Sequence, residues 1–326
     1  MKENQRVLVT GGAGVIGCEL LSVLLNNNFT VLSVDKNPLP AKKVELLSLN
    51  NPKLRHLVAD LSTDSLTDLI DFNPSAIFHL AAVFERSKES PQFWNTNWNE
   101  NTLLSHRIVD LVREIPSLKV FVLASSYLIY MPDIYMCEHQ SAPVALNEDS
   151  PLNPRNITGA SKFYTEKELE FIHEYISPDL RFINARIYRV YGRGSRDVIS
   201  RWTRAALRDE EIHVYNRQNR FDFIYAQDVA LGLYRLFLSN DGCGTVNLGS
   251  GTSTSIGEVI NSLSLLIPVK QSKDMGQIEQ YEASMADITK LSTLTGWAPE
   301  TSLLKGLEQI IEYEKELLRC QRPLQK

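Results

Sequence analysis

Short apolar runs alternate with longer amphipathic segments through the first half of the chain. The runs are rich in Val, Ile, Leu or Phe, which is typical of strands buried on both faces, and they cover residues 6–10, 29–35, 54–60, 76–82, 119–126 and 180–188. The segments between them have helical spacing and cover residues 15–27, 62–72, 92–114 and 157–175. This alternation predicts an α/β fold, a doubly wound parallel sheet with helices on both faces.

The second half of the chain is less regular. Its pattern predicts helices at 196–209, 227–238, 256–265 and 302–318, with strands at 221–225 and within 244–251. No long Pro, Ser or Gly linker separates the halves, so we expect a smaller α/β lobe interleaved with the sheet. We place the cofactor-binding domain at 1–185, with 221–240 returning to it, and a mainly substrate-binding lobe at 186–326.

A glycine-rich turn follows the first predicted strand. The stretch GAGVIG (12–17) matches G-x-G-x-x-G between a strand and a helix, the context in which this motif binds a dinucleotide pyrophosphate. Asp35 ends the second strand, 18 residues after Gly17. Its carboxylate suits the ribose hydroxyls of NAD and would repel the 2′-phosphate of NADP, although Lys36 could soften that repulsion. The expected cofactor contacts here are Gly11, Gly14, Val15, Ile16, Gly17 and Asp35.

Composition narrows the classes of function. The 326 residues are 43% hydrophobic with a net charge of −5, so the total charge implies no nucleic-acid partner. No apolar run approaches the roughly 20 residues that span a bilayer, and the N-terminus shows no signal peptide. The four cysteines lie far apart without a C-x-x-C motif. We therefore expect a cytoplasmic protein that binds no metal and has no membrane partner.

Motifs along nearly the whole chain resemble those of the extended short-chain dehydrogenase/reductase family, whose members act largely on nucleotide sugars with NAD in a Rossmann domain. They are TGGAGVIG (10–17), VADL (58–61), HLAA (79–82), LASSYLIY (123–130), RNITGASK (155–162), RFDFIYAQDVA (220–230), VNLGSG (246–251) and the closing segment 286–307. The resemblance implies further cofactor contacts at Asp60, Leu61, Leu80, Ala81, Ala82, Asn97 and Lys162. It also implies a homodimer formed through helices 92–114 and 157–175.

The chain has only two of the family's three catalytic residues. The resemblance places the family's serine, which holds the substrate oxygen, at Ser126, and its lysine, which binds the nicotinamide ribose, at Lys162. The family's tyrosine base corresponds to Thr158. Thr158 and Lys162 are four residues apart and share one helix face. An aliphatic hydroxyl is a much weaker acid than a phenol, so Thr158 is a poor proton acceptor near neutral pH.

Three interpretations of this departure remain open. Another group could supply the base, with Tyr127, Tyr130, Tyr135 and His139 following the fifth predicted strand. Thr158 could instead relay a proton through water. In the third interpretation the protein binds NAD and a ligand without turnover.

Two further departures bear on reaction and substrate. Family members that dehydrate C5–C6 carry an Asp-Glu pair after the serine or threonine, where this chain has Tyr127 and Leu128. We therefore expect epimerisation or oxidation of a sugar hydroxyl, not 4,6-dehydration. The family's asparagine before V-Y-G is Arg189 here, and Arg220 opens the RFDF segment. Arginine binds phosphate oxygens in a bidentate manner, so we expect both residues to bind a nucleotide diphosphate.

Overall fold

A parallel sheet forms the centre of the molecule. The computed structural model describes residues 5–84, 89–137, 142–239, 243–271 and 281–321. Seven strands lie in the order β12-β8-β5-β4-β1-β2-β3, and every neighbouring pair is parallel. They are β1 (Arg6–Thr10), β2 (Thr30–Asp35), β3 (Leu54–Val58), β4 (Ala76–His79), β5 (Val120–Ser126), β8 (Arg181–Ile187) and β12 (Gly244–Leu248). The predicted doubly wound fold is confirmed.

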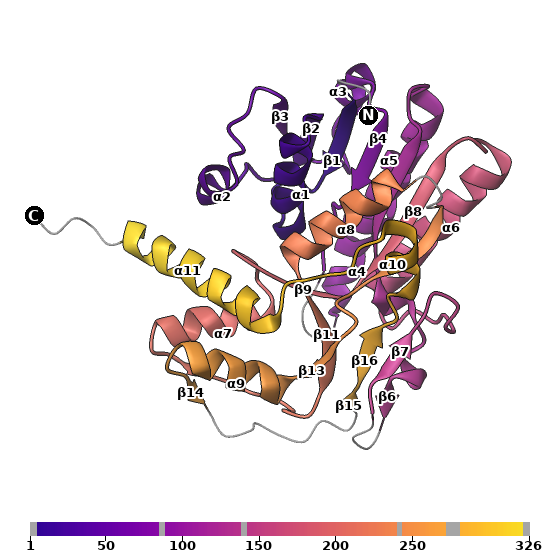
Figure 1. Cartoon of the computed structure of the whole chain (residues 1–326). Coiled ribbons are helices and arrows are strands. Elements are labelled where there is room, and N and C mark those ends of the chain that lie inside the picture. The colour runs from indigo at the N-terminus through magenta and orange to yellow at the C-terminus, as the bar shows by residue number, and fades with distance from the viewer. Residues whose placement is uncertain (1–4, 85–88, 138–141, 240–242, 272–280, 322–326) are drawn as a thin grey trace, which may run out of the picture.

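Helices cover both faces of this sheet (Figure 1). Alternate residues of β1 point to opposite faces, as the pleat of a strand requires. Val7 and Val9 pack with α1 (Val15–Asn26) and α8 (Ala226–Leu238), whereas Leu8 packs with α5 (Leu104–Glu114) and α6 (Ile157–Tyr175). Both faces are therefore apolar, which explains the continuous hydrophobic runs of the strands.

The predicted helix at 62–72 is wrong at its start. The helix α3 spans Thr67–Phe72, and the residues before it form turns. Asp64 accepts a hydrogen bond from the backbone N–H of Asp60, and Asp60 accepts bonds from both the N–H and the hydroxyl of Ser62. Short acidic side chains that bond nearby backbone groups compete in this way with helix formation.

The predicted helix at 92–114 is continuous but not uniform. It consists of α4 (Pro91–Asn97), a π-helical turn at Trp98–Leu103 and then α5. Ser90 caps its start by accepting a hydrogen bond from Phe93 N, and Pro91 occupies the first helical position, where it is tolerated best. Within the π turn, Asn101 bonds the side chain of Asn97 and the backbone of Val83. The turn therefore holds this helix to the segment that follows β4.

A smaller lobe is built largely from the second half of the chain. Its three-stranded sheet has the order β13-β11-β9, from Ser253–Ser255, Arg220–Tyr225 and Arg189–Tyr191. Beside it lie α7 (Val198–Leu207), α9 (Ile256–Leu266) and α11 (Leu303–Gln321) (Figure 1). Their apolar residues form a separate core that includes Tyr191, Ile199, Trp202, Phe223, Val259 and Leu307.

Short elements connect the two parts. Two pairs of strands, β6 with β15 and β7 with β16, join Met136–Cys137 to Tyr281–Glu282 and Val144–Leu146 to Ser284–Ala286. A third pair, β10 with β14, joins Glu211–Ile212 to Lys270–Gln271 within the smaller lobe. The remaining elements are α2 (Ala41–Leu46), α10 (Thr289–Thr295) and the 3₁₀ turns η2 (Tyr127–Ile129) and η3 (Pro132–Ile134). Segments from both halves of the chain therefore pair with each other, and β6, β7, β15 and β16 lie together in the lower part of Figure 1.

The chain returns to the main sheet after building part of the smaller lobe. The helix α8 packs against α1, and β12 pairs with β8 at the sheet edge. The strand β11 belongs instead to the small sheet. Residues 226–238 and 244–248 thus lie with the main sheet, and residues 220–225 do not. Within the described residues, no helix has the length and apolarity needed to cross a bilayer.

Candidate active site

The glycine turn after β1 packs closely against the end of β4 and the start of α1. Gly11 has a φ of +75°, and a Cβ there would lie 2.7 Å from the backbone nitrogen of Ala81. A Cβ on Gly17 would lie 2.2 Å from the carbonyl oxygen of Gly11. Gly14 precedes α1 and provides no side-chain cap. The first N–H groups of a helix have no partner within it, so those of Val15 and Ile16 can meet a pyrophosphate.

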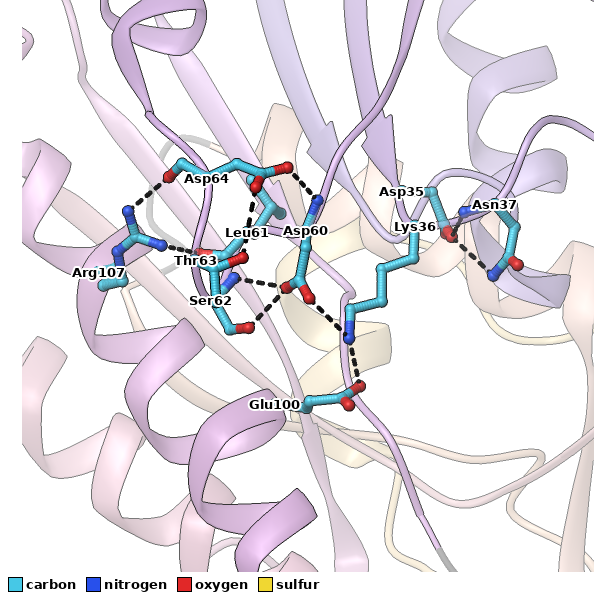
Figure 2. A network of polar contacts seen from close by, with 10 residues as sticks. All are labelled: Asp35, Lys36, Asn37, Asp60, Leu61, Ser62, Thr63, Asp64, Glu100 and Arg107. Carbon is cyan, nitrogen blue, oxygen red and sulfur yellow. Dashed lines mark hydrogen bonds and ion pairs between the residues drawn. The ribbon is translucent and has the colours of Figure 1, made fainter.

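Asp35 ends β2 beside this turn. Its carboxylate accepts hydrogen bonds from Ala13 N at 3.1 Å and from Asn37 N at 2.9 Å. The Asn37 side chain also donates to it, at 3.3 Å (Figure 2). These bonds hold the carboxylate where the sequence places the adenosine ribose of NAD.

Lys36 points away from Asp35 and toward two acidic side chains (Figure 2). Its ammonium lies 3.0 Å from Asp60 and 3.1 Å from Glu100. Burial opposes the charge of Lys36, but hydrogen bonds to Asp60 and Glu100 outweigh burial and raise its pKa. Lys36 is thus already paired, which argues against the expectation that it softens the repulsion of a 2′-phosphate.

The loop after β3 is held from the opposite side. Arg107 on α5 donates to the carbonyl oxygens of Leu61 at 2.5 Å and of Asp64 at 2.6 Å (Figure 2). Hydrogen bonds from Ser62 and Lys36 outweigh burial and lower the pKa of Asp60. Asp60 and Leu61, the predicted contacts of the adenine, therefore lie near Asp35 in a loop that is held in place by hydrogen bonds from Arg107.

The end of β4 lies directly beside the glycine turn. Leu80 N donates to the carbonyl oxygen of Thr10 at 3.1 Å, and Ala81 N to its hydroxyl at 3.3 Å. Ala82, the next predicted cofactor contact, is exposed. The structure thus brings Leu80 and Ala81, predicted from the HLAA motif, to the same end of the sheet as Gly11.

Asn97 bridges two helices. It is 7% exposed, and its amide donates to the hydroxyl of Ser161 on α6 at 2.8 Å. Its side-chain oxygen accepts from Asn101. In this structure Asn97 therefore ties the α4–α5 helix to α6.

Ser126 and α6 are brought close together by a glycine. Ser126 ends β5, and its hydroxyl accepts a hydrogen bond from Leu128 N at 3.2 Å. A Cβ on Gly159 would lie 2.7 Å from the carbonyl oxygen of Leu128. Only a residue without a side chain lets α6 approach the turn after Ser126 this closely.

Thr158 and Lys162 share one face of α6 and are both buried. Thr158 is 7% exposed and Lys162 is 6% exposed. Among the described residues, Nζ of Lys162 has no hydrogen-bond partner. Burial lowers the pKa of Lys162 to about 8. An unpaired buried ammonium is costly, so Lys162 fits a ligand that supplies polar groups, as the ribose of NAD would.

Glu89 is a residue of this site that the sequence pattern did not reveal. Its carboxylate accepts hydrogen bonds from the Thr158 hydroxyl at 2.9 Å, from Thr158 N at 3.2 Å and from Ile157 N at 2.9 Å. Glu89 directly precedes Ser90, the N-cap of α4, in a segment without periodicity. The only sign in the sequence was an acidic residue just before a helix cap, and this pattern does not by itself indicate a functional residue.

The tyrosines proposed as alternative bases are poorly suited to that role. The Tyr127 hydroxyl donates to Glu282 at 3.0 Å, its ring stacks on Tyr188, and burial raises its pKa. The Tyr130 hydroxyl donates to Asn247 at 2.6 Å. Burial raises the pKa of Tyr130 and of Tyr135 to about 12. His139 lies outside the described residues.

The two arginines predicted to bind phosphate each have an acidic partner. Arg189 lies 3.1 Å from Glu282, and its guanidinium lies over the ring of Phe221, 3.9 Å from the ring centre. Arg220 lies 3.1 Å from Glu258 and donates to the carbonyl oxygen of Ser253. Neither guanidinium is free, so a diphosphate here would share them with these carboxylates.

Comparison with known proteins identifies the family of this chain. The model of the NAD dependent epimerase/dehydratase family matches residues 7–249. The putative UDP-glucose 4-epimerase of Methanocaldococcus jannaschii is 27% identical over 319 residues, which cover 95% of this chain and 98% of that protein. The UDP-glucuronate 4-epimerase of Thermodesulfobacterium geofontis is 28% identical over 326 residues, covering 95% and 96%.

A solved structure shows the same architecture. MoeE5, in complex with UDP-glucose and NAD, is 28% identical and has a TM-score of 0.80 over 96% of this chain and 99% of its own. These matches confirm the resemblance to extended short-chain dehydrogenases/reductases and the assignment of NAD as cofactor. Since the family model matches most of its length, the chain belongs to the NAD-dependent epimerase/dehydratase family.

Proposed function

We propose that this protein is an NAD-dependent epimerase that oxidises and re-reduces a ring hydroxyl of a UDP-sugar. The observation that carries the proposal is the buried ammonium of Lys162, which has no hydrogen-bond partner among the described residues. It lies one helical turn from Thr158 on α6, the helix that packs against β5. The two relatives named above are UDP-sugar 4-epimerases, which favours C4 as the reacting carbon.

In this proposal the chain contributes binding and proton transfer. NAD, when bound, supplies the hydride acceptor and donor. Ser126 holds the reacting oxygen, Lys162 positions the ribose, and Thr158 carries a proton. The residues proposed to hold NAD are Gly11, Gly14, Val15, Ile16, Gly17, Asp35, Asp60, Leu61, Leu80, Ala81, Ala82, Asn97 and Lys162. Tyr127 is not retained as a base, because its hydroxyl is bonded to Glu282.

The substrate's diphosphate is proposed to meet Arg189 and Arg220. The Arg189 side chain is 37% exposed although it is paired with Glu282, so a diphosphate can reach part of its guanidinium. Dehydration is not proposed, because no carboxylate follows Ser126 directly. The proposed NAD-binding domain covers residues 1–185, with 221–240 returning to it. The proposed lobe that binds the sugar nucleotide covers mainly residues 186–326.

Incubation of the purified protein with NAD and either UDP-glucose or UDP-glucuronic acid tests this function. We expect the C4 epimer to accumulate for at least one of them, measured by proton NMR, with UDP alone as the control. If NAD binds tightly and no UDP-sugar is converted or changes the nicotinamide absorbance, the protein is instead the non-catalytic NAD-binding protein of the third interpretation.

We also propose a cytoplasmic homodimer formed through the helices predicted at 92–114, which runs from α4 to α5, and at 157–175, which is α6. No disulfide forms within the described residues, which fits a reducing compartment. On α6, Tyr164, Phe171 and Tyr175 are 51%, 56% and 65% exposed, and together they form an exposed aromatic face that suits a partner.

Phe171→Glu is expected to convert the dimer to a monomer, because it places a charge in that apolar face. Light scattering coupled to size exclusion measures the mass. Leu265→Glu is the matched control, since Leu265 is 80% exposed on α9, outside the proposed interface. A wild-type monomer, or a Phe171→Glu variant that remains dimeric, contradicts this proposal.

A further inference from the structure

Glu89 bonds the residue that stands where the family has its tyrosine. One carboxylate oxygen accepts the Thr158 hydroxyl at 2.9 Å, and the other accepts Ile157 N at 2.9 Å. The two residues are 69 positions apart in the chain, so folding alone brings them together. Glu89 is partly buried, and Thr158 is almost fully buried.

Because Thr158 donates its hydrogen to Glu89, the oxygen of its hydroxyl can still accept a hydrogen bond. A hydroxyl has one hydrogen to donate and two lone pairs to accept. Because the carboxylate of Glu89 can only accept when ionised, Thr158 donates its hydrogen to Glu89. Its lone pairs stay available for a donor such as a substrate hydroxyl. One turn along the same helix face, the buried ammonium of Lys162 has no partner among the described residues.

The chemistry of oxidation requires a final proton acceptor that Thr158 alone does not provide. Oxidising a carbinol to a ketone removes a hydride from carbon and a proton from oxygen. Thr158 can pass a proton on, but an alkoxide is too basic to hold the charge near neutral pH. A carboxylate in direct contact with Thr158 can take that proton.

We propose that Glu89 is the proton acceptor of this site and receives the proton through Thr158. The inference rests on the proposed function. As the substrate C–H bond breaks, its hydrogen and electron pair leave as hydride to NAD. The substrate O–H proton passes to Oγ1 of Thr158, the Thr158 proton passes to Glu89, and the substrate becomes a ketone. The same transfers in reverse regenerate the hydroxyl after hydride returns to the opposite face.

A purely structural role for Glu89 predicts different results. The N-terminus of α6 already has a cap, because Asn156 accepts a hydrogen bond from Gly159 N at 2.8 Å. If Glu89 only stabilises this helix end, its removal lowers thermal stability and leaves the pH dependence of kcat unchanged. If Glu89 takes the proton, its removal lowers kcat, and the decrease of kcat at acid pH (the acid limb of the profile) is absent from the variant.

Four variants separate these roles. Glu89→Gln keeps the size of the side chain and removes proton acceptance, and we expect kcat to fall by about 100-fold or more. Thr158→Val removes the relay and should have a similar effect, whereas Thr158→Ser should retain activity within about tenfold. Asp68→Asn is the matched control, since Asp68 is an exposed carboxylate in the first turn of α3.

Two readouts accompany the rates. Thermal melting and NAD content show whether each variant is folded and loaded. Difference infrared spectroscopy after mixing with a UDP-sugar should show a protonated carboxyl band in the wild type as NAD is reduced, and no such band in Glu89→Gln. Added formate should restore part of the activity of Glu89→Ala by supplying a carboxylate.

The outcomes distinguish this proposal from the proposed function. An active wild type with an equally active Glu89→Gln, or one that keeps the acid limb, overturns the role of Glu89 and leaves the epimerase. An inactive wild type that binds NAD overturns both. Four results together support Glu89 as the acceptor. In Glu89→Gln, kcat falls and loses its decrease at acid pH. The wild type shows the protonated carboxyl band, and formate restores activity to Glu89→Ala.

Discussion

Glu282→Gln is expected to lower the free energy of unfolding by about 3 kcal/mol, because it removes the one anion shared by two arginines. Glu282 is 3% exposed, and its Oε2 lies 2.6 Å from Arg155 and 3.1 Å from Arg189. Its Oε1 accepts the Tyr127 hydroxyl at 3.0 Å. The variant keeps the shape of the side chain, so the loss reports the missing charge.

The pH dependence of this loss has a definite sign. Burial alone would raise the pKa of Glu282, but the charges of Arg189 and Arg155 and the hydrogen bonds to it outweigh burial and lower the pKa. A lowered pKa means that the stabilisation is present above the unfolded value of about 4.3 and is lost as pH falls through the folded value. The difference between wild type and variant should therefore be largest near neutral pH and shrink in acid.

Denaturant unfolding at several pH values measures this difference. Glu314→Gln is the matched control, because Glu314 is also buried but pairs, within the described residues, with Arg204 alone, at 2.9 Å. We expect the control to lose less stability. Equal losses in the two variants, or a loss for Glu282→Gln that is constant from neutral to acid pH, would contradict the shared-anion explanation.

Local patterns predicted the main sheet because its causes are local. A strand buried on both faces must be apolar throughout, and RVLVT or VFVLASS shows that directly in the sequence. The glycine turn was equally visible, since the absence of side chains at Gly11 and Gly17 is itself the structural requirement. The helix predicted from residue 62 failed where Asp60 and Asp64 bond the backbone, a competition that periodicity does not report.

The candidate site was only half predictable. Thr158 and Lys162 are four residues apart, so their shared face follows from helix geometry. The acidic partners of the site come from distant segments: Glu89 meets Thr158 across 69 positions, and Glu282 meets Arg155 across 127. Nothing in the local pattern around either glutamate indicates its partner. Such contacts depend on how elements pack, and that packing is decided by the whole chain.

Lys162→Met is expected to stabilise the cofactor-free protein and to reduce turnover by about 1000-fold. Lys162 is 6% exposed, and its buried ammonium has no hydrogen-bond partner in the described part of the chain. A methionine of similar length removes the cost of burying that charge, which is on the order of 3 kcal/mol for a pKa lowered from about 10.4 to about 8. Turnover falls because the variant loses the positive charge proposed to meet the ribose and the proton-transfer groups of α6.

The stability of Lys162→Met relative to the wild type should fall as pH rises, as it does for Glu282→Gln, but over a more alkaline range. Burial lowers the pKa of Lys162 to about 8, below its unfolded value of about 10.4. The native state then binds fewer protons than the unfolded state between these values, so the wild type gains stability as pH rises from about 8 to about 10.4. The advantage of the variant should be full at pH 7 and vanish above that range.

Melting curves of cofactor-free protein measure this advantage, and Lys167→Met, which replaces an exposed lysine of the same helix, is the control. A cofactor-free Lys162→Met variant that melts below the wild type at pH 7 would show that the ammonium has a stabilising partner, and the proposed vacancy for the ribose would then be wrong.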